Sequence, residues 1–185
     1  MNKFYKLKIA VIGLLIFLTQ QSNAQNIFGL AGNNLIVFRA NNPAIIINNL
    51  PVTGVMAGQT LSGLDFRPST GQLYALGYNS SNGQAQLYTI NRTNGVASVV
   101  NVLPVMLSSG IQKIGFDFNP TVDRIRVTGD NDVNYRLHPE TGALVATDGN
   151  LSYGSGDVNN GANPSIGSVA YSNSYIGATS TTLYN

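Results

Sequence analysis

Two segments of this chain repeat the same residue pattern, and the repeat constrains the fold more than any other feature. Residues 63–74 read GLDFRPSTGQLY and residues 115–126 read GFDFNPTVDRIR, so glycine, Asp-Phe and proline recur at a constant offset of 52. A fixed period of this size marks a structural unit that cannot bury its apolar face alone and therefore stacks on copies of itself. The chain is thus predicted to be a series of similar units.

Each complete unit is predicted to hold four short antiparallel strands. Apolar and polar residues alternate in short runs, and Pro, Asn, Ser and Gly fill the gaps between the runs. Alternation predicts strands, whereas the residues in the gaps predict tight turns. The first unit is assigned strands at 61–66, 72–78, 85–91 and 96–100, and the second at 113–118, 124–128, 134–137 and 143–146.

Partial copies of the unit flank the two complete ones. Strands are expected upstream at 27–31, 35–40 and 44–47, without a Gly-x-Asp-Phe strand, and downstream at 166–171 and 182–184. Four-stranded sheets at this period are typical blades of a β-propeller, which usually closes with about four to eight of them. We therefore expect an all-β chain with about three propeller-like blades in residues 25–185, forming an incomplete ring truncated at the C-terminus. A β-sandwich is the alternative fold.

The first 24 residues have the features of a signal peptide. Lys3, Lys6 and Lys8 precede an uncharged, mainly apolar run at 9–18, and Ser22 and Ala24 place small residues where a signal peptidase reads them. The apolar run is too short for a permanent membrane-spanning helix. Cleavage is expected after Ala24, which predicts an exported domain in the periplasm, at the cell surface or outside the cell, with no membrane span after cleavage.

The charge of the chain limits its possible partners, and its lack of cysteine limits its possible chemistry. Three of the ten Lys and Arg residues and none of the eight acids lie in the signal segment, so residues 25–185 carry seven basic and eight acidic residues, a formal charge of −1. A charge-poor surface of this kind does not attract nucleic acid through a long-range field. The chain has no cysteine, which excludes disulfides, thiol catalysis and cysteine-ligated metals.

The acids of the repeat, Asp65 and Asp117, are the first candidate site residues. In a functional interpretation, these two acids line a central channel and bind a cation or a sugar. In the favoured structural interpretation, each carboxylate accepts backbone N–H groups from the adjacent turn. Arg124 and Arg126 alternate with apolar residues and are expected to form ion pairs within the stack, with Asp65 or Asp117 as possible partners.

The segment from Asp148 to Pro164 is the longest stretch without strand character and is rich in side-chain oxygens. Long ordered loops in compact domains are often functional, and calcium prefers oxygen ligands. Asp148, Asp157 and Asn159 are the candidate calcium ligands, and no other cofactor is predicted. The favoured interpretation is a polar loop that is ordered by its own side-chain hydrogen bonds.

Several segments carry a family resemblance, namely Gly63–Pro68, Gly115–Pro120, Gly156–Pro164 and Gly177–Tyr184. They resemble the signature segments of a bacterial secreted family catalogued as domain of unknown function 4394, and the similarity runs from about Phe28 to Asn185. The resemblance implies an exported, propeller-like β domain that continues beyond Leu183-Tyr184 in other members. It implies no established activity and no catalytic residues.

These observations favour a non-enzymatic binding or surface-display module whose extracellular ligand is a carbohydrate or a protein. They show no nucleophile elbow, and a single histidine, His138, cannot form a multi-histidine metal site. A carbohydrate-active hydrolase or lyase that uses paired acids is the second hypothesis. A structural spacer within a larger adhesin is the third.

Overall fold

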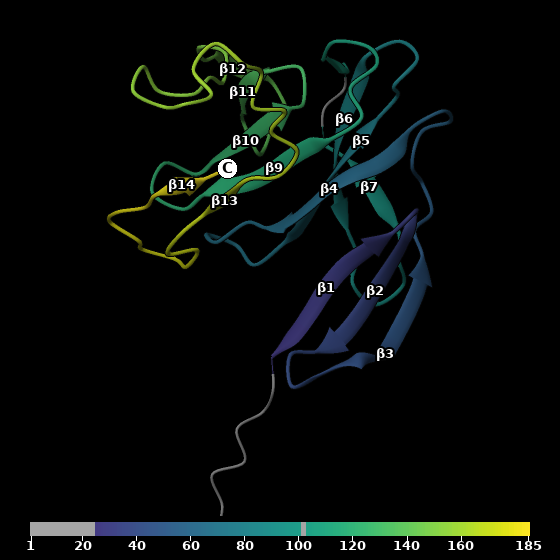
Figure 1. The fold of residues 1–185 in the computed structure, drawn as a ribbon. Coiled ribbons are helices and arrows are strands. Elements are labelled where there is room, and N and C mark those ends of the chain that lie inside the picture. Colours follow the sequence, from purple (N-terminus) through teal and green to yellow (C-terminus); the bar gives the residue numbers. More distant parts are fainter. Residues whose placement is uncertain (1–24, 101–102) are drawn as a thin grey trace, which may run out of the picture.

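The protein is all-β, as the sequence predicts. The computed structural model describes residues 25–100 and 103–185, and within them the chain forms fourteen strands and no helix (Figure 1). No described segment therefore provides a helix that is long and apolar enough to cross a bilayer. The predicted signal peptide lies outside the described residues.

The first sheet is the predicted partial unit. It consists of β1 (Asn26–Ala31), β2 (Asn34–Arg39) and β3 (Asn42–Pro51), paired antiparallel in the order β1-β2-β3. Strand β3 is longer than the predicted 44–47 because irregular pairing on either side of Phe38 lets it follow β2 along its whole length. No Gly-x-Asp-Phe strand belongs to this sheet among the described residues, as expected.

The two complete units form separate sheets. The second sheet has the order β4 (Thr60–Phe66), β5 (Leu73–Tyr78), β6 (Gln84–Ile90) and β7 (Ala97–Val99). The third has the order β9 (Ile114–Asn119), β10 (Arg124–Gly129), β11 (Asn134–Leu137) and β12 (Leu144–Thr147). The two Asp-Phe segments therefore lie in different sheets, on β4 and β9, which is the arrangement that stacked repeats require.

Two elements differ from the prediction. Strand β8 (Val105–Met106) was not expected, and it pairs with the start of β6 next to the main path of the second sheet. The strand predicted at 166–171 is wrong over most of its length, because only β13 (Ala170–Tyr171) pairs, with β14 (Leu183–Tyr184). A strand needs a hydrogen-bonding partner along its edge, and β14 is only two residues long.

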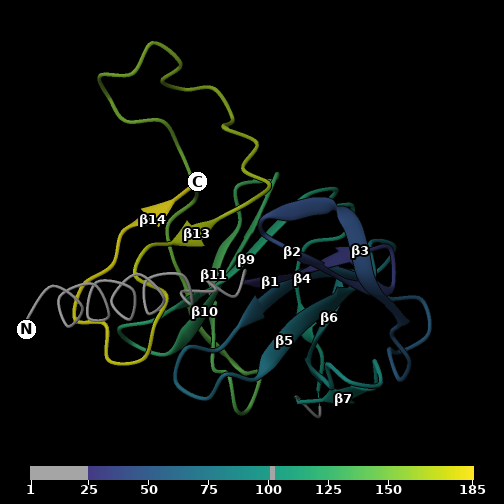
Figure 2. The ribbon, with the colours of Figure 1, turned by 90° about the horizontal axis from the view of Figure 1, so that it is seen from below.

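The sheets follow one another through contacts between β1 and β4, between β4 and β9, and between β9 and β13 (Figures 1 and 2). The second sheet is buried on both sides as a result, and all six residues of β5 are buried. Leu73 and Ala75 face the core shared with the first sheet, whereas Tyr74, Leu76 and Tyr78 face the core shared with the third. Each unit thus covers an apolar face of its neighbour, whereas the arrangement of the units as an incomplete propeller ring stays a prediction.

One turn recurs between the strands. The N–H of its fifth residue donates to the C=O of its first, and that fifth residue has a left-handed backbone. Glycine normally occupies such a position because it has no Cβ. Gly71 does so with φ of 69°, and Asp123, at the same offset of 52, has φ of 51°. The same turn ends at Gly83, Gly95 and Gly142.

Candidate functional site

Asp65 links the second sheet to the third, and Asp117 links the third sheet to the fourth, which consists of β13 and β14. One oxygen of Asp65 accepts the N–H of Phe66 at 2.7 Å, and the other accepts the N–H of Phe118 on β9 at 2.8 Å. Asp117 accepts the N–H of Tyr171 on β13 at 2.7 Å. The carboxylates therefore accept backbone N–H groups, but the inter-sheet donors belong to the neighbouring sheet and not to the adjacent turn.

The two carboxyl groups influence each other's protonation, and burial dominates their electrostatics. Desolvation, followed by the charge of Asp65, raises the pKa of Asp117 from 3.8 to about 7. Desolvation also raises the pKa of Asp65, against the backbone N–H groups that favour its ionised form. Near neutral pH the pair therefore tends to hold one proton between two acids.

From the raised pKa of Asp117, we expect the protein to be less stable at pH 8 than at pH 5. Because the folded state binds the proton of Asp117 more tightly than the unfolded state, the contribution of Asp117 to stability is full below about pH 4 and is lost as the pH rises through about 7. We expect a loss of about 1–2 kcal/mol between pH 5 and 8, reduced from the full shift because solvent screens the pair. Urea unfolding at the two pH values measures it.

Asp117→Asn keeps an acceptor for the N–H of Tyr171 but cannot titrate, so most of this pH dependence should disappear in the variant. Asp157→Asn, at an exposed acid, is the matched control and should keep the wild-type dependence. Equal pH dependence in wild type and Asp117→Asn contradicts the assignment.

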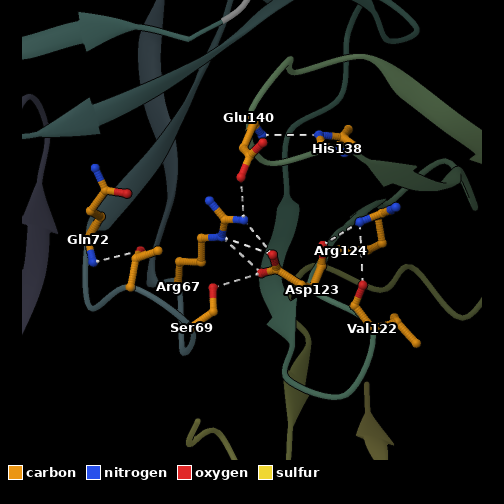
Figure 3. A network of polar contacts seen from close by, with 9 residues as sticks. Arg67, Ser69, Gln72, Val122, Asp123, Arg124, His138 and Glu140 are labelled. Atoms are coloured by element: carbon orange, nitrogen blue, oxygen red, sulfur yellow. Dashed lines mark hydrogen bonds and ion pairs between the residues drawn. The ribbon is translucent and has the colours of Figure 1, made fainter. Parts of the chain in front are cut away.

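A second link between the second and third sheets centres on Arg67, whose guanidinium is buried (Figure 3). Its Nε and Nη2 bind both carboxylate oxygens of Asp123, and Nη2 also donates to Glu140 at 3.1 Å. Ser69 donates to Asp123 at 3.3 Å. These bonds lower the pKa of Asp123. Asp123 therefore occupies the left-handed turn position in place of glycine and supplies an inter-sheet ion pair, which the repeat pattern alone did not reveal.

The third sheet holds an additional ion-pair cluster around Asp148. Both Arg126 and Arg136 pair with this carboxylate, Arg136 at 2.8 Å. Arg126 also donates to the hydroxyl of Tyr171 and to the side-chain oxygen of Asn134. Arg126 thus forms an ion pair within its own sheet, not with Asp65 or Asp117, and Arg124 donates to backbone oxygens of its own turn.

The predicted calcium ligands sit in different surroundings. Asp148 is already neutralised by two guanidinium groups, whereas the side chain of Asp157 accepts the N–H of Asn159 within an exposed turn. In the described part of the chain, no three His, Cys, Asp or Glu side chains are placed to hold a metal ion. Calcium binding stays a prediction, in which the ion would compete with Arg126 and Arg136.

Thermal melts of the full chain test the calcium prediction. Excess calcium should raise the melting temperature by several degrees relative to a chelator, because an ion that binds only the folded state stabilises it. Asp157→Asn should remove that increase. Coincident melts of the wild type in calcium and in chelator eliminate the calcium site.

Among the hollows on the described surface, three are relevant to binding. The largest of these three, about 700 Å³, is mostly apolar and lies between residues 103–106 and the turn at 140–144. The smallest, about 240 Å³, lies beside Phe28 and Asp65. The third, about 560 Å³, is lined by residues 70–73 and 89–94 with Val96 and Ser98, and we call it the turn groove.

The turn groove has the polar character expected of a binding site. Thr89 on β6 and Ser98 on β7 are direct cross-strand partners, so their side chains lie on one face of the second sheet. Within the described residues, the side chains of Gln72, Thr89 and Ser98 have no hydrogen-bond partner, and Arg92 forms no ion pair. Residues 70–73 belong to the repeated segment, but the other lining residues do not follow a known binding motif. Sequence reasoning missed this site because only the pairing register of three strands brings these residues together.

His138 is half-buried, more enclosed than a fully exposed turn residue, and its Nδ1 accepts the N–H of Glu140 at 3.2 Å. This bond stabilises the turn that presents Glu140 to Arg67 (Figure 3). The histidine therefore has a local structural contact.

Comparison with curated proteins and with solved structures found no match. A family model described as a domain of unknown function, DUF4394, matches residues 34–185. That match spans the second and third sheets, and with them both acids that link successive sheets. The chain therefore belongs to the DUF4394 family of domains of unknown function.

Proposed function

We propose that this chain is an exported, non-enzymatic binding module whose ligand occupies the turn groove. The observation that carries the proposal is the set of unpaired amide and hydroxyl side chains, Gln72, Thr89 and Ser98, around a hollow of about 560 Å³. Ligand sites typically enclose about 300–1,000 Å³ and place a few polar groups to orient the ligand. Amides and hydroxyls complement the hydroxyl groups of carbohydrates.

The apolar hollow supports binding less well. Its lining includes the exposed Leu103 and Met106 but few polar groups that would orient a small ligand. Its one carboxylate, Glu140, is engaged by Arg67.

A carbohydrate-active hydrolase or lyase is the second candidate, because Asp117 lies next to Asp65 and its pKa is raised to about 7. Glycosidases place two carboxyl groups on either side of the bond they cleave, about 5–10 Å apart. Asp65 and Asp117 instead bond to backbone N–H groups and contact each other. Of the described hollows, only the one of about 240 Å³ is lined by Asp65, and Asp117 lines none of the three. These contacts support a structural role for the pair.

Affinity electrophoresis of the purified full chain through gels that contain single polysaccharides tests the proposal. We expect at least one polysaccharide to retard the protein, with no release of reducing ends on prolonged incubation. Thr89→Val with Ser98→Ala should reduce the retardation, whereas Thr147→Val with Ser155→Ala, at exposed positions outside the groove, should not.

Three outcomes overturn the proposal in different ways. Release of reducing ends by the wild type that is lost in Asp65→Asn or Asp117→Asn identifies a hydrolase or lyase. Retardation that both double variants retain places the site elsewhere. No retardation by any polysaccharide removes carbohydrate binding and favours the spacer hypothesis.

A further inference from the structure

We infer that the turn groove recognises an acidic glycan, with Arg92 binding a carboxylate of the ligand and the adjacent amide and hydroxyl side chains binding its hydroxyl groups. This inference rests on the proposed function and specifies the class of ligand. It follows from the position of Arg92, from the charges around it and from the donor geometry of a guanidinium group.

Arg92 is held in place by aromatic rings at the junction of two sheets. The centre of its guanidinium lies 5.4 Å from the ring centroid of Phe66 on β4 and 5.9 Å from that of Phe28 on β1. The two rings contact each other edge to face, with centroids 5.3 Å apart. Stacking on aromatic faces restrains a long, flexible side chain and leaves the N–H edge of the guanidinium free. Arg92 is therefore positioned before a ligand arrives.

The charge of Arg92 is not neutralised within the described chain. Arg67, Arg126 and Arg136 form ion pairs with acids, whereas no acid pairs with Arg92. Arg92 is also the only charged residue in the lining of the turn groove as described. The groove thus presents one fixed positive charge and no carboxylate, which favours an anionic ligand.

The chemistry of the guanidinium selects the type of anion. Its planar set of N–H donors binds a carboxylate through two parallel hydrogen bonds, which a neutral hydroxyl group cannot match. Gln72, Thr89 and Ser98 supply both donors and acceptors for sugar hydroxyls on the same groove. A hydroxyl-rich polymer with carboxylates, such as a polyuronate, offers a partner both to the guanidinium and to the amide and hydroxyl side chains. Because residues 25–185 carry a net charge of −1, attraction to such a polymer must be local.

Polygalacturonate and its fully methyl-esterified form are the matched probes, since esterification removes the charge and keeps the sugar. We expect the full chain to bind the acid form at least about tenfold more tightly, as measured by affinity electrophoresis and calorimetry. Arg92→Gln should lose about tenfold or more in affinity for the acid form, and Arg92→Lys should recover only part of it. Arg39→Gln, which removes the same charge from an exposed arginine outside the groove, should bind as the wild type does.

Each contrary result has its own meaning. Equal binding of the acid and esterified polymers overturns the acidic ligand but leaves the binding function in place. Equal losses in Arg92→Gln and Arg39→Gln show non-specific attraction and overturn the role of Arg92. No binding of either polymer by the wild type overturns the inference, and binding of another glycan in the same assay then shows that the proposed function stands. Thermal melts within about 2 °C of wild type confirm that the Arg92 variants are folded.

Discussion

Phe118→Ala is expected to lower the free energy of unfolding by about 4 kcal/mol. Phe118 is fully buried between the second and third sheets, where its ring meets Tyr74 edge to face at 5.2 Å and Phe116 at 6.4 Å. Removing the ring leaves a cavity in the core between the second and third sheets. Strand β9 is held by its pairing with β10 and by the bond from the N–H of Phe118 to the carboxylate of Asp65, so it cannot collapse into that cavity.

Urea unfolding followed by circular dichroism measures the change, and the melting temperature should decrease by roughly 8–16 °C for a chain of this size. Tyr175→Ala is the matched control, because Tyr175 is 58% exposed and its truncation should change stability by less than about 0.5 kcal/mol. A loss below about 1 kcal/mol in Phe118→Ala contradicts the view that the two repeats share one core.

Arg67→Met is expected to cost about 3 kcal/mol, the second largest effect. The guanidinium of Arg67 is nearly fully buried, and it binds Asp123 through two atoms while also contacting Glu140. Without it, the carboxylate of Asp123 is left in a partly buried position without its ion-pair partner, and only the charge of Arg124 remains nearby. Because the side chain of Asp123 is 33% exposed, water solvates the unpaired carboxylate in part. The expected loss of stability is therefore at the lower end of the range for breaking a buried ion pair.

Two comparisons make this prediction specific. Glu140→Gln should cost less than about 1 kcal/mol, because the side chain of Glu140 is 66% exposed. The pairing lowers the pKa of Asp123, so its stabilisation is present above the ordinary pKa of an aspartate and is lost as the pH falls through the lowered value. The difference between wild type and Arg67→Met should therefore shrink below about pH 4. A constant difference down to pH 2 contradicts the ion-pair explanation.

Much of the fold was predictable because strand and turn signals are local. The strand predicted at 134–137 has those bounds in the structure, and the predicted turns between strands recur with a left-handed residue at their ends. The failures have a physical cause as well. Residues 166–169 alternate as a strand does but lack a partner in the described chain, and Val105–Met106 form a strand only because the edge of β6 is available. Alternation of apolar and polar residues indicates that a segment favours the extended conformation. A strand also needs a second strand with which to form hydrogen bonds, and the sequence of the segment does not show whether one is available.

The candidate site was less predictable. Asp65 and Asp117 stood out because they repeat, and they proved to be linked to the next sheet. The role of Arg92 was not visible in the sequence, because its guanidinium lies over Phe66 of its own unit and Phe28 of another, and only the folded chain brings these rings together. Likewise, nothing near Arg67 in the chain indicates Asp123, which lies 56 residues away.

The sequence by itself determined that the chain is all-β and built of short antiparallel strands joined by tight turns, since alternation and turn residues act over a few neighbouring positions. Only the tertiary structure decided which charges meet and which remain unpaired. The partners of Arg67, Asp117 and Arg126 depend on how whole sheets stack and in which register they pair. That stacking is set by buried side chains from several units at once, so no single segment of the sequence specifies it.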